Sequence, residues 1–411
     1  MSGSRSNEPP CPSHLSQAGS RPHAGTPATA TLPLVNAAAP YLDALADMAP
    51  LVAAEAERSE REARTTPPVA ERIVDAGLYR LYLPRSLGEP ELDVPPALEV
   101  FEAASRIDGS FGWAVTIGSG GGLFAGALEP ATAAEIFGPK EALIAGSGKP
   151  GGTAKPVDSG YLAGGRWNFA SGAHHATFFT ANCFVEGERA ADDSGPLIRA
   201  MAFPAAEVEV VETWDPAGMR GTGSHDFQVE SSLVPLRRTF GVFDDWPYER
   251  GPLYQYPFNH HAETSFAAVA LGIGRHAIDE FLDLASRPSL YTGQPLGDRQ
   301  GARVRLGEAE ALVSAARAWF FEVARSSWDT VVGGDALEDE EAARVSLASI
   351  HAATSAARAA TLLFEAGGSA SLDGGSPLAR AWRDVHALSK HVAVSPLGYE
   401  AAAAGLLDTE E

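Results

Sequence analysis

Cysteine is scarce in this sequence: 411 residues contain only Cys11 and Cys183. Cys11 falls in a stretch rich in Ser, Pro, Ala, Gly and Thr, so a structural disulfide is not expected. No Cys/His cluster has the spacing of a zinc site. No apolar run reaches the roughly 18 residues that span a bilayer, and the N-terminus lacks the apolar core of a signal peptide. These absences predict a cytoplasmic protein without a membrane span or a metal.

Positive charge is also in short supply. Lys and Arg together number 31 against 53 Asp and Glu, which gives a formal net charge of −22. Binding of nucleic acid needs clustered basic side chains, so nucleic acid is not an expected partner, and solubility alone explains the acidity. Apolar residues make up 45% of the chain, enough for a globular core in two or three layers or domains.

The pattern of apolar residues divides the chain into four regions. Residues 1–36 have the composition of a disordered tail. Residues 37–138 show helical spacing, and residues 139–245 show short β-branched and aromatic runs punctuated by glycine. Residues 246–411 contain four segments long enough for bundle helices, at 259–286, 299–332, 338–366 and 377–406. The predicted fold class is α+β: an N-terminal helical domain, a middle antiparallel β-barrel or sheet domain, and a C-terminal four-helix bundle.

Four sequence motifs are spread along these helical and strand regions. They read IDGSFGWAV (107–115), WNFASGAHHATFF (167–179), WDPAGMRGTGSHDFQV (214–229) and LARAWRDVHALSKH (378–391). With them, residues 40–408 resemble the acyl-CoA dehydrogenase superfamily, and within it the two-component flavin-dependent monooxygenases, the group D hydroxylases. That resemblance implies an oxygenase component that uses reduced FMN or FAD from a separate flavin reductase. It would use O2 to hydroxylate an apolar, aromatic or heteroaromatic small molecule through a C4a-hydroperoxyflavin, as a homotetramer.

The sequence departs from relatives in this superfamily at two places. In many of the dehydrogenases a Glu follows the Arg-Asp pair by eight or nine residues and removes the substrate α-proton. Here those positions are His391 and Val392, which speaks against acyl-CoA dehydrogenation and agrees with the hydroxylase branch. Several hydroxylases also carry a His in the helix after the Gly-Trp pair, and the segment after Trp113 has none. Its substrate is therefore not expected to match that of any phenol hydroxylase closely.

Ser171 and His391 are the predicted catalytic residues. The resemblance places Ser171 at the flavin N5 edge, where it would help hold the proton of the peroxide in a dry site. The alternative is a turn Ser at the Gly172 bend. His391 would act as a near-neutral acid or base, on the same helical stripe as Asp384. Arg383 and Asp384 are expected to form ion pairs that fix the helix; the alternative for His391 is a packed or exposed helical side chain.

The predicted cofactor-binding residues come from several regions. The glycine-rich turn at 218–224 runs into an alternating strand and not a helix, so it does not match a dinucleotide-binding loop, and a plain β-turn is the alternative. The resemblance implies that the turn at residues 367–368 and a cation early in the second bundle helix serve the flavin of a neighbouring subunit. The full set of predicted cofactor-binding residues is Ser147, Trp167, Ser171, Thr222, Ser224, Arg303, Gly367 and Gly368.

Aromatic and imidazole side chains make up the predicted substrate pocket: Trp113, His175, Phe258 and His261. His174 and His175, if on a strand, would point to opposite faces, so only one of them would face a cavity. For His261 and its neighbour the alternative is a surface pair at a helix start, and for the aromatic residues it is the core.

Two other function classes stay open from the sequence. One is an acyl-CoA dehydrogenase or flavin oxidase with a displaced catalytic base, which acyl-CoA would reveal by bleaching oxidised flavin. The other is a non-catalytic protein of the same fold, which would form no oxygen adduct with reduced flavin.

Overall fold

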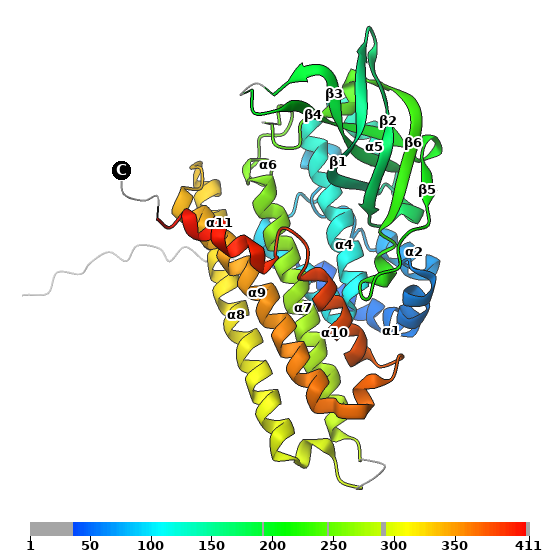
Figure 1. The fold of residues 1–411 in the computed structure, drawn as a ribbon. Coiled ribbons are helices and arrows are strands. Elements are labelled where there is room, and N and C mark those ends of the chain that lie inside the picture. The colour runs from blue at the N-terminus through cyan, green and yellow to red at the C-terminus, as the bar shows by residue number, and fades with distance from the viewer. Residues whose placement is uncertain (1–35, 191–192, 245, 289–292, 408–411) are drawn as a thin grey trace, which may run out of the picture. The chain divides into compact units, whose positions relative to one another are not determined.

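A computed structural model describes residues 36–190, 193–244, 246–288 and 293–407 (Figure 1). Helices come first along the chain, then a sheet, then helices again, as predicted. Nearly all of the predicted tail, residues 1–35, lies outside the described residues. The predicted domain boundaries near residues 138 and 245 fall between elements, because α5 ends at Phe137 before β1 and β7 ends at Phe240 before α6. That each region is a domain of its own stays a prediction.

The first region contains five α-helices, whose turns follow the expected signals. Asp108 is the N-cap of α4, and its carboxylate accepts a hydrogen bond from the Phe111 N–H at 3.0 Å. Proline occupies the first turn of α2, α3 and α5, where a missing N–H costs nothing. The elements are α1 (Ala39–Glu62), α2 (Pro67–Asp75), η1 (Arg85–Leu87), α3 (Val94–Ile107), α4 (Gly109–Gly121), η2 (Gly122–Ala127) and α5 (Pro130–Phe137).

The middle region is one seven-stranded sheet with the order β5-β6-β2-β1-β3-β4-β7. Among the described strands all pairings are antiparallel, as predicted, except that β1 and β3 run parallel. The sheet is therefore mixed, because the segment after β2 carries the chain past β1 to its other edge. The elements are β1 (Ile144–Val157), β2 (Gly160–Ala170), η3 (Ala173–His175), β3 (Phe178–Arg189), β4 (Pro196–Pro204), η4 (Ala205–Glu207), β5 (Glu209–Val211), η5 (Arg220–Thr222), β6 (His225–Pro235), η6 (Leu236–Arg238) and β7 (Thr239–Phe240).

Three long helices, α7, α8 and α9, form most of the last region and lie side by side in Figure 1. The predicted fourth helix is interrupted: α10 ends at Leu388 and helical structure resumes at Pro396. Proline disfavours helix in the residue before it, and the Ser395 side chain caps the new turn by accepting the Leu397 N–H. The elements are α6 (Pro252–Gln255), α7 (Phe258–Ser286), η7 (Leu296–Asp298), α8 (Gln300–Gly333), α9 (Asp339–Gly367), η8 (Gly368–Leu372), α10 (Pro377–Leu388), η9 (Pro396–Gly398) and α11 (Tyr399–Ala404).

α7 connects the first and last regions, since it packs against α3 and α4 of the first and against α9 and α10 of the last. Its middle is buried, and alanine and glycine let neighbouring helices approach closely. Within the described residues, no helix is both long enough and apolar enough to cross a membrane.

Candidate active site

Segments far apart in the sequence meet around Trp113 of α4. Its indole N–H donates a hydrogen bond to Ser171 Oγ at 2.9 Å, and its ring lies 4.5 Å from the ring of Phe266 on α7. The imidazole of His391 lies 4.6 Å from the Phe266 ring and 5.9 Å from the Trp113 ring, measured between centroids. Both predicted catalytic residues, Ser171 and His391, therefore reach the same pair of aromatic rings.

A tight bend at the end of β2 positions Ser171. Phe169 adopts a left-handed φ of 67°, which is rare for an aromatic residue, and its carbonyl accepts the Ser171 N–H at 3.0 Å. Gly172 follows with φ 76°, and its N–H bonds to the Thr222 carbonyl. The expected bend at Gly172 is present, but the Ser171 hydroxyl bonds to other side chains instead of capping it. The bend also leaves the Phe169 side chain 64% exposed, next to the Ser171 segment.

Two hydroxyl groups of the 218–224 turn extend the hydrogen-bonded chain that begins at Ser171. Ser171 Oγ lies 2.8 Å from Ser224 Oγ, which lies 2.7 Å from Thr222 Oγ1. Thr222 in turn donates to the Met219 carbonyl at 2.8 Å. All three hydroxyl residues are buried. Residues Arg220–Thr222 of this turn form a 3-10 turn, and Thr222 and Ser224 lie on the same hydroxyl network as Ser171.

His391 lies just beyond a helix and not on one, so the helical stripe shared with Asp384 does not exist. α10 ends at Leu388, and the His391 N–H bonds to the Leu388 carbonyl in the turn that follows. Burial lowers the pKa of His391 to about 4, which keeps the ring neutral at pH 7. Its Nδ1 accepts the Ala393 N–H at 3.3 Å, so the ring proton is on Nε2.

The other side of the 218–224 turn packs against charged side chains of α10 and their partners on α1 and at the start of α4. Asp384 Oδ1 accepts the Met219 N–H at 2.6 Å, and Asp384 Oδ2 has no partner among the described residues. Burial, and then the nearby Asp108, raise the pKa of Asp384 to about 7. Arg380 pairs with Asp108 at 3.1 Å. A Cβ on Gly218 would lie 2.2 Å from the Arg383 carbonyl, so only glycine allows this approach.

One of the two predicted ion pairs is present. Arg383 pairs with Glu60 of α1, as expected. Asp384 instead bonds the backbone of the 218–224 turn, so the ion pair predicted for it is wrong. We refer to Glu60, Asp108, Arg380, Arg383 and Asp384 together as the ionic cluster.

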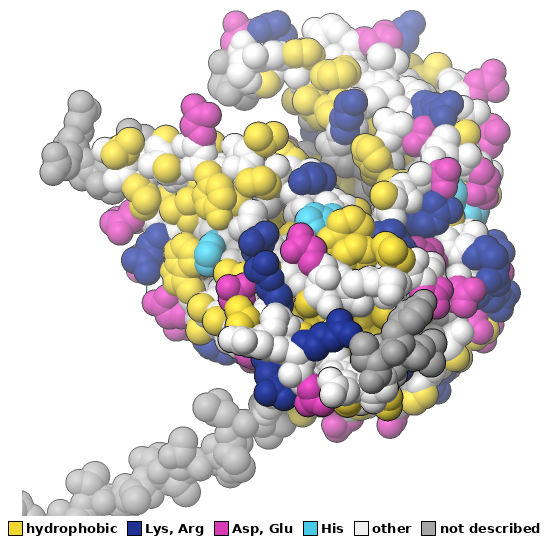
Figure 2. Space-filling model, turned by 60° about the horizontal axis from the view of Figure 1, so that its bottom comes forward, with side chains coloured by type: hydrophobic (Ala, Val, Ile, Leu, Met, Phe, Trp, Pro, Cys, Tyr) yellow, Lys and Arg dark blue, Asp and Glu magenta, His cyan; other side chains and the backbone are white. Residues whose placement is uncertain are grey.

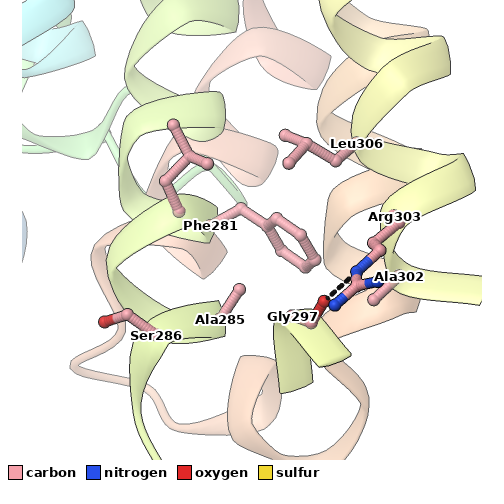
Figure 3. Close-up of a pocket in the computed structure, with 8 residues that line it drawn as sticks. Phe281, Ala285, Ser286, Gly297, Ala302, Arg303 and Leu306 are labelled. Carbon is pink, nitrogen blue, oxygen red and sulfur yellow. Dashed lines mark hydrogen bonds between the residues drawn. The ribbon is translucent and has the colours of Figure 1, made fainter. Parts of the chain in front are cut away.

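Arg303, Gly367 and Gly368 lie at the far end of the bundle. Arg303 lines a cavity of about 220 Å³ between α7 and α8, and its Nε donates to the Gly297 carbonyl at 2.6 Å (Figure 3). Phe281 and Ala285 line the same cavity. Between Phe266 and Ala285 α7 rises about 28 Å. Within one chain these residues therefore do not meet Ser171.

Three other predicted residues lie in separate surroundings. Trp167 is buried in the core of the sheet, where it stacks on Phe227 at 5.1 Å and donates to the Asn182 carbonyl. Ser147 lies on β1 opposite Ala181 of β3. Phe258, at the start of α7, packs in an aromatic cluster with Phe124 and Trp246.

The two predicted pocket histidines make backbone contacts elsewhere. His175 lies in the 3-10 turn η3, so the strand expected at His174 and His175 is wrong, and its Nε2–H donates to the Thr65 carbonyl at 2.8 Å. His261 is 3% exposed and donates to the Leu253 carbonyl, so the alternative of a surface pair is also wrong. Burial lowers the pKa of His261 to about 4.

Comparisons with known proteins agree on one class. Residues 264–396 match the family described as acyl-CoA dehydrogenase, C-terminal domain. The chain is 32% identical to an indole-3-acetate monooxygenase of Pseudomonas putida, over 82% of this chain and 86% of that protein. It is 27% identical to the flavin-dependent monooxygenase oxygenase subunit HsaA of Mycobacterium tuberculosis, over 86% of this chain and 92% of that protein.

A solved structure shows the same fold with a cofactor. XiaF from Streptomyces sp., in complex with FADH2 and glycerol, superimposes with a TM-score of 0.82 at 25% identity, over 90% of this chain and 95% of that one. This chain belongs to the flavin-dependent monooxygenases of the acyl-CoA dehydrogenase superfamily.

Membership confirms the predicted fold, the oxidoreductase class and the dependence on flavin. As an oxygenase component, this flavin-dependent monooxygenase relies on a separate flavin reductase and acts on a small molecule. The two alternatives left open by the sequence, a dehydrogenase and a non-catalytic protein, are set aside.

One group of side chains in this monooxygenase has the spacing of a metal site, although the sequence predicts none. Glu212 lies 3.2 Å from His174 Nε2 and 3.1 Å from His225 Nε2. His225 Nδ1, however, accepts the N–H groups of both Thr213 and Trp214, which leaves its proton on Nε2. A metal ion at Nε2 would have to displace that proton, so the group acts as a hydrogen-bonded support for the loop.

Sequence reasoning missed several residues of the site. Phe266 sits in an apolar stretch of α7 that reads as ordinary core, and nothing in its spacing marks it. Asp108 carried a usable signal, since an Asp directly before a Gly-Ser-Phe helix start is a typical N-cap. Its pairing with Arg380 joins residues 272 apart and could not be read from spacing.

Proposed function

We propose that the flavin ring binds beside Trp113, Ser171, Phe266 and His391, and that an aromatic or heteroaromatic small molecule is oxygenated there. One observation carries the proposal: the Trp113–Ser171 hydrogen bond and the His391–Phe266 contact bring both predicted catalytic side chains to the same aromatic pair.

The donor set fits a flavin. An isoalloxazine ring is flat, apolar on its faces and lined with nitrogen and oxygen atoms at one edge. The group offers aromatic faces, buried hydroxyls and an imidazole that burial keeps neutral. Phe169 adds an exposed aromatic face on a strained backbone just before Ser171.

When bound and reduced, the flavin supplies the electrons and activates O2. The residues of this chain exclude water with the Trp113 and Phe266 rings, accept a hydrogen bond at Ser171 Oγ and hold a proton at His391 Nε2. Because the His391 ring is neutral, it offers its Nε2–H as a donor without bringing a charge into the site.

We also propose that Arg303, Gly367 and Gly368 contact the flavin of a neighbouring subunit in a homotetramer, and that the protein works in the cytoplasm. The separation of about 28 Å along α7 supports a role outside the same chain's Ser171 site. Arg303 provides a cation for a phosphate in an otherwise acidic protein. FMN and FAD both stay candidates, and indole-3-acetate is the first substrate to try because the P. putida relative is named for it.

The test supplies the protein with a flavin reductase, NADH, FMN or FAD, 18O2 and a panel of indoles and phenols. We expect incorporation of one 18O atom into an aromatic substrate, detected by mass spectrometry. NADH oxidation that yields only hydrogen peroxide with every substrate would contradict the aromatic assignment. Bleaching of oxidised flavin by acyl-CoA would contradict it as well.

A further inference from the structure

The hydroxyl chain that leaves Ser171 has a direction fixed at both ends. We define it as Trp113 Nε1, Ser171 Oγ, Ser224 Oγ, Thr222 Oγ1 and the Met219 carbonyl. An indole N–H can only donate, and a carbonyl oxygen can only accept. Everything between these ends is a hydroxyl with a single proton.

The positions of the three protons follow by elimination. Thr222 spends its proton on the Met219 carbonyl, so Ser224 must donate across the 2.7 Å contact to Thr222. Ser224 then has none left, and Ser171 must donate across the 2.8 Å contact to Ser224. Ser171 already accepts the Trp113 N–H. What Ser171 has left to offer a ligand is one lone pair and no proton.

This polarity distinguishes the two redox states of a flavin. Flavin N5 carries an N–H when the ring is reduced and is a bare acceptor when it is oxidised. A Ser171 held as an acceptor can pair with the first and not with the second. We propose that Ser224 and Thr222 are positioning residues that hold Ser171 as an acceptor and so make the protein select reduced over oxidised flavin.

The backbone supports the far end of the chain. Met219 has a left-handed φ of 58°, and its N–H is held by Asp384, so the carbonyl that ends the chain is fixed in place. The Trp214 indole N–H donates to the same carbonyl at 3.0 Å. The inference rests on the proposed place of Ser171 at the flavin.

The experiment compares dissociation constants for oxidised flavin and, under anaerobic conditions, for reduced flavin. Ser224→Ala and Thr222→Val free the Ser171 proton, so oxidised flavin gains a donor. We expect the ratio of the oxidised to the reduced constant to fall about fivefold, the worth of one hydrogen bond. The midpoint potential of the bound flavin should fall by about 20 mV for a two-electron couple. Thr222→Ser keeps the hydroxyl and should keep the wild-type ratio.

Thr65→Val is the matched control, since Thr65 donates to the Gly221 carbonyl on the same turn but lies outside the chain. It should leave the ratio unchanged. If Ser171→Ala lowers the ratio while Ser224→Ala and Thr222→Val do not, the hydroxyl chain has no such role. If Ser171→Ala leaves the ratio unchanged, the proposed place of the flavin is wrong instead. Thermal unfolding of each variant separates these outcomes from a failure to fold.

Discussion

The turn from Gly218 to Ser224 has two sides built from different chemistry. Towards Ser171 it presents the hydroxyls of Thr222 and Ser224, and Ser171 in turn bonds to Trp113. The His391 ring, which contacts Trp113, is kept neutral by burial. Towards α10 it packs against the ionic cluster, where Asp384 holds the Met219 N–H. The difference indicates that charge is used behind the turn to fix its shape and is kept away from the side proposed for the flavin.

The same contrast separates the site from the far end of the bundle. There Arg303 lies at a cavity rim, and acidic and basic side chains are interspersed with hydrophobic ones over the face shown in Figure 2. The proposed homotetramer would use this end for a neighbour's cofactor, while the uncharged side of the turn would hold the ring.

Breaking the ionic cluster should have the largest effect. Arg380→Met leaves Asp108 and Asp384 as buried acids without their cation, and we expect the free energy of unfolding to drop by about 3–5 kcal/mol. Chemical denaturation measures it. Arg106→Met is the control, because its pair with Asp279 is exposed and should contribute less than about 1 kcal/mol. Equal losses in the two variants would contradict a structural role for the cluster.

The contribution of Asp384 to the pH dependence of stability sharpens the comparison between the two sides of the turn. Because burial raises the pKa of Asp384 from 3.8 to about 7, the unfolded chain releases this proton first as pH rises. The contribution of Asp384 to the stability of the wild-type protein is therefore lost between about pH 4 and pH 7, and Asp384→Asn removes this contribution. The unfolding free energy of the variant relative to wild type should rise across that window by about 4 kcal/mol. A flat difference across the window would show that Asp384 is not buried as an acid.

On the uncharged side, Ser171→Ala should affect turnover more than stability. Loss of the hydroxyl leaves the Trp113 N–H without its acceptor and Ser224 without the donor Ser171. We expect oxygenated product per O2 consumed to fall roughly fivefold, with a matching rise in hydrogen peroxide. Thr65→Val should keep the wild-type yield. An unchanged yield in Ser171→Ala would remove its assigned role.

The smallest expected effect concerns His391, whose imidazole should not titrate near pH 6.5 in the folded protein. Since burial lowers its pKa to about 4, the ring stays neutral as pH falls through the ordinary value of 6.5. The unfolded chain takes up this proton first, so the stability that depends on the neutral ring is complete above about pH 6.5 and is lost progressively between about pH 6.5 and pH 4. NMR of the labelled imidazole measures this titration. A midpoint near 6.5 in the folded protein would mean that the ring is not enclosed by Trp113 and Phe266.

The sequence alone predicts the order of elements and much of the site. Helical spacing predicts the helical region at 37–138, and the motifs bring Trp113, Ser171, Thr222, Ser224 and His391 into one group. These predictions succeed because they depend on local periodicity or on sequence patterns that the family shares.

The features that the sequence analysis placed wrongly depend on contacts between segments far apart in the chain. The predicted helix at 377–406 includes His391, but α10 ends at Leu388 and a new helical turn begins at Pro396. The parallel β1–β3 pairing and the Asp108–Arg380 pair join segments whose approach is set by the whole fold. His175 and His261 were chosen for their chemistry, yet backbone carbonyls hold both.

A crystal structure of the protein prepared anaerobically with reduced flavin tests the central claim most directly. The account predicts that the flavin ring lies at the Trp113–Phe266 pair, with one of its edge atoms within hydrogen-bonding distance of Ser171 Oγ. A ring bound on the α10 side of the turn, or only in the cavity at Arg303, would contradict it.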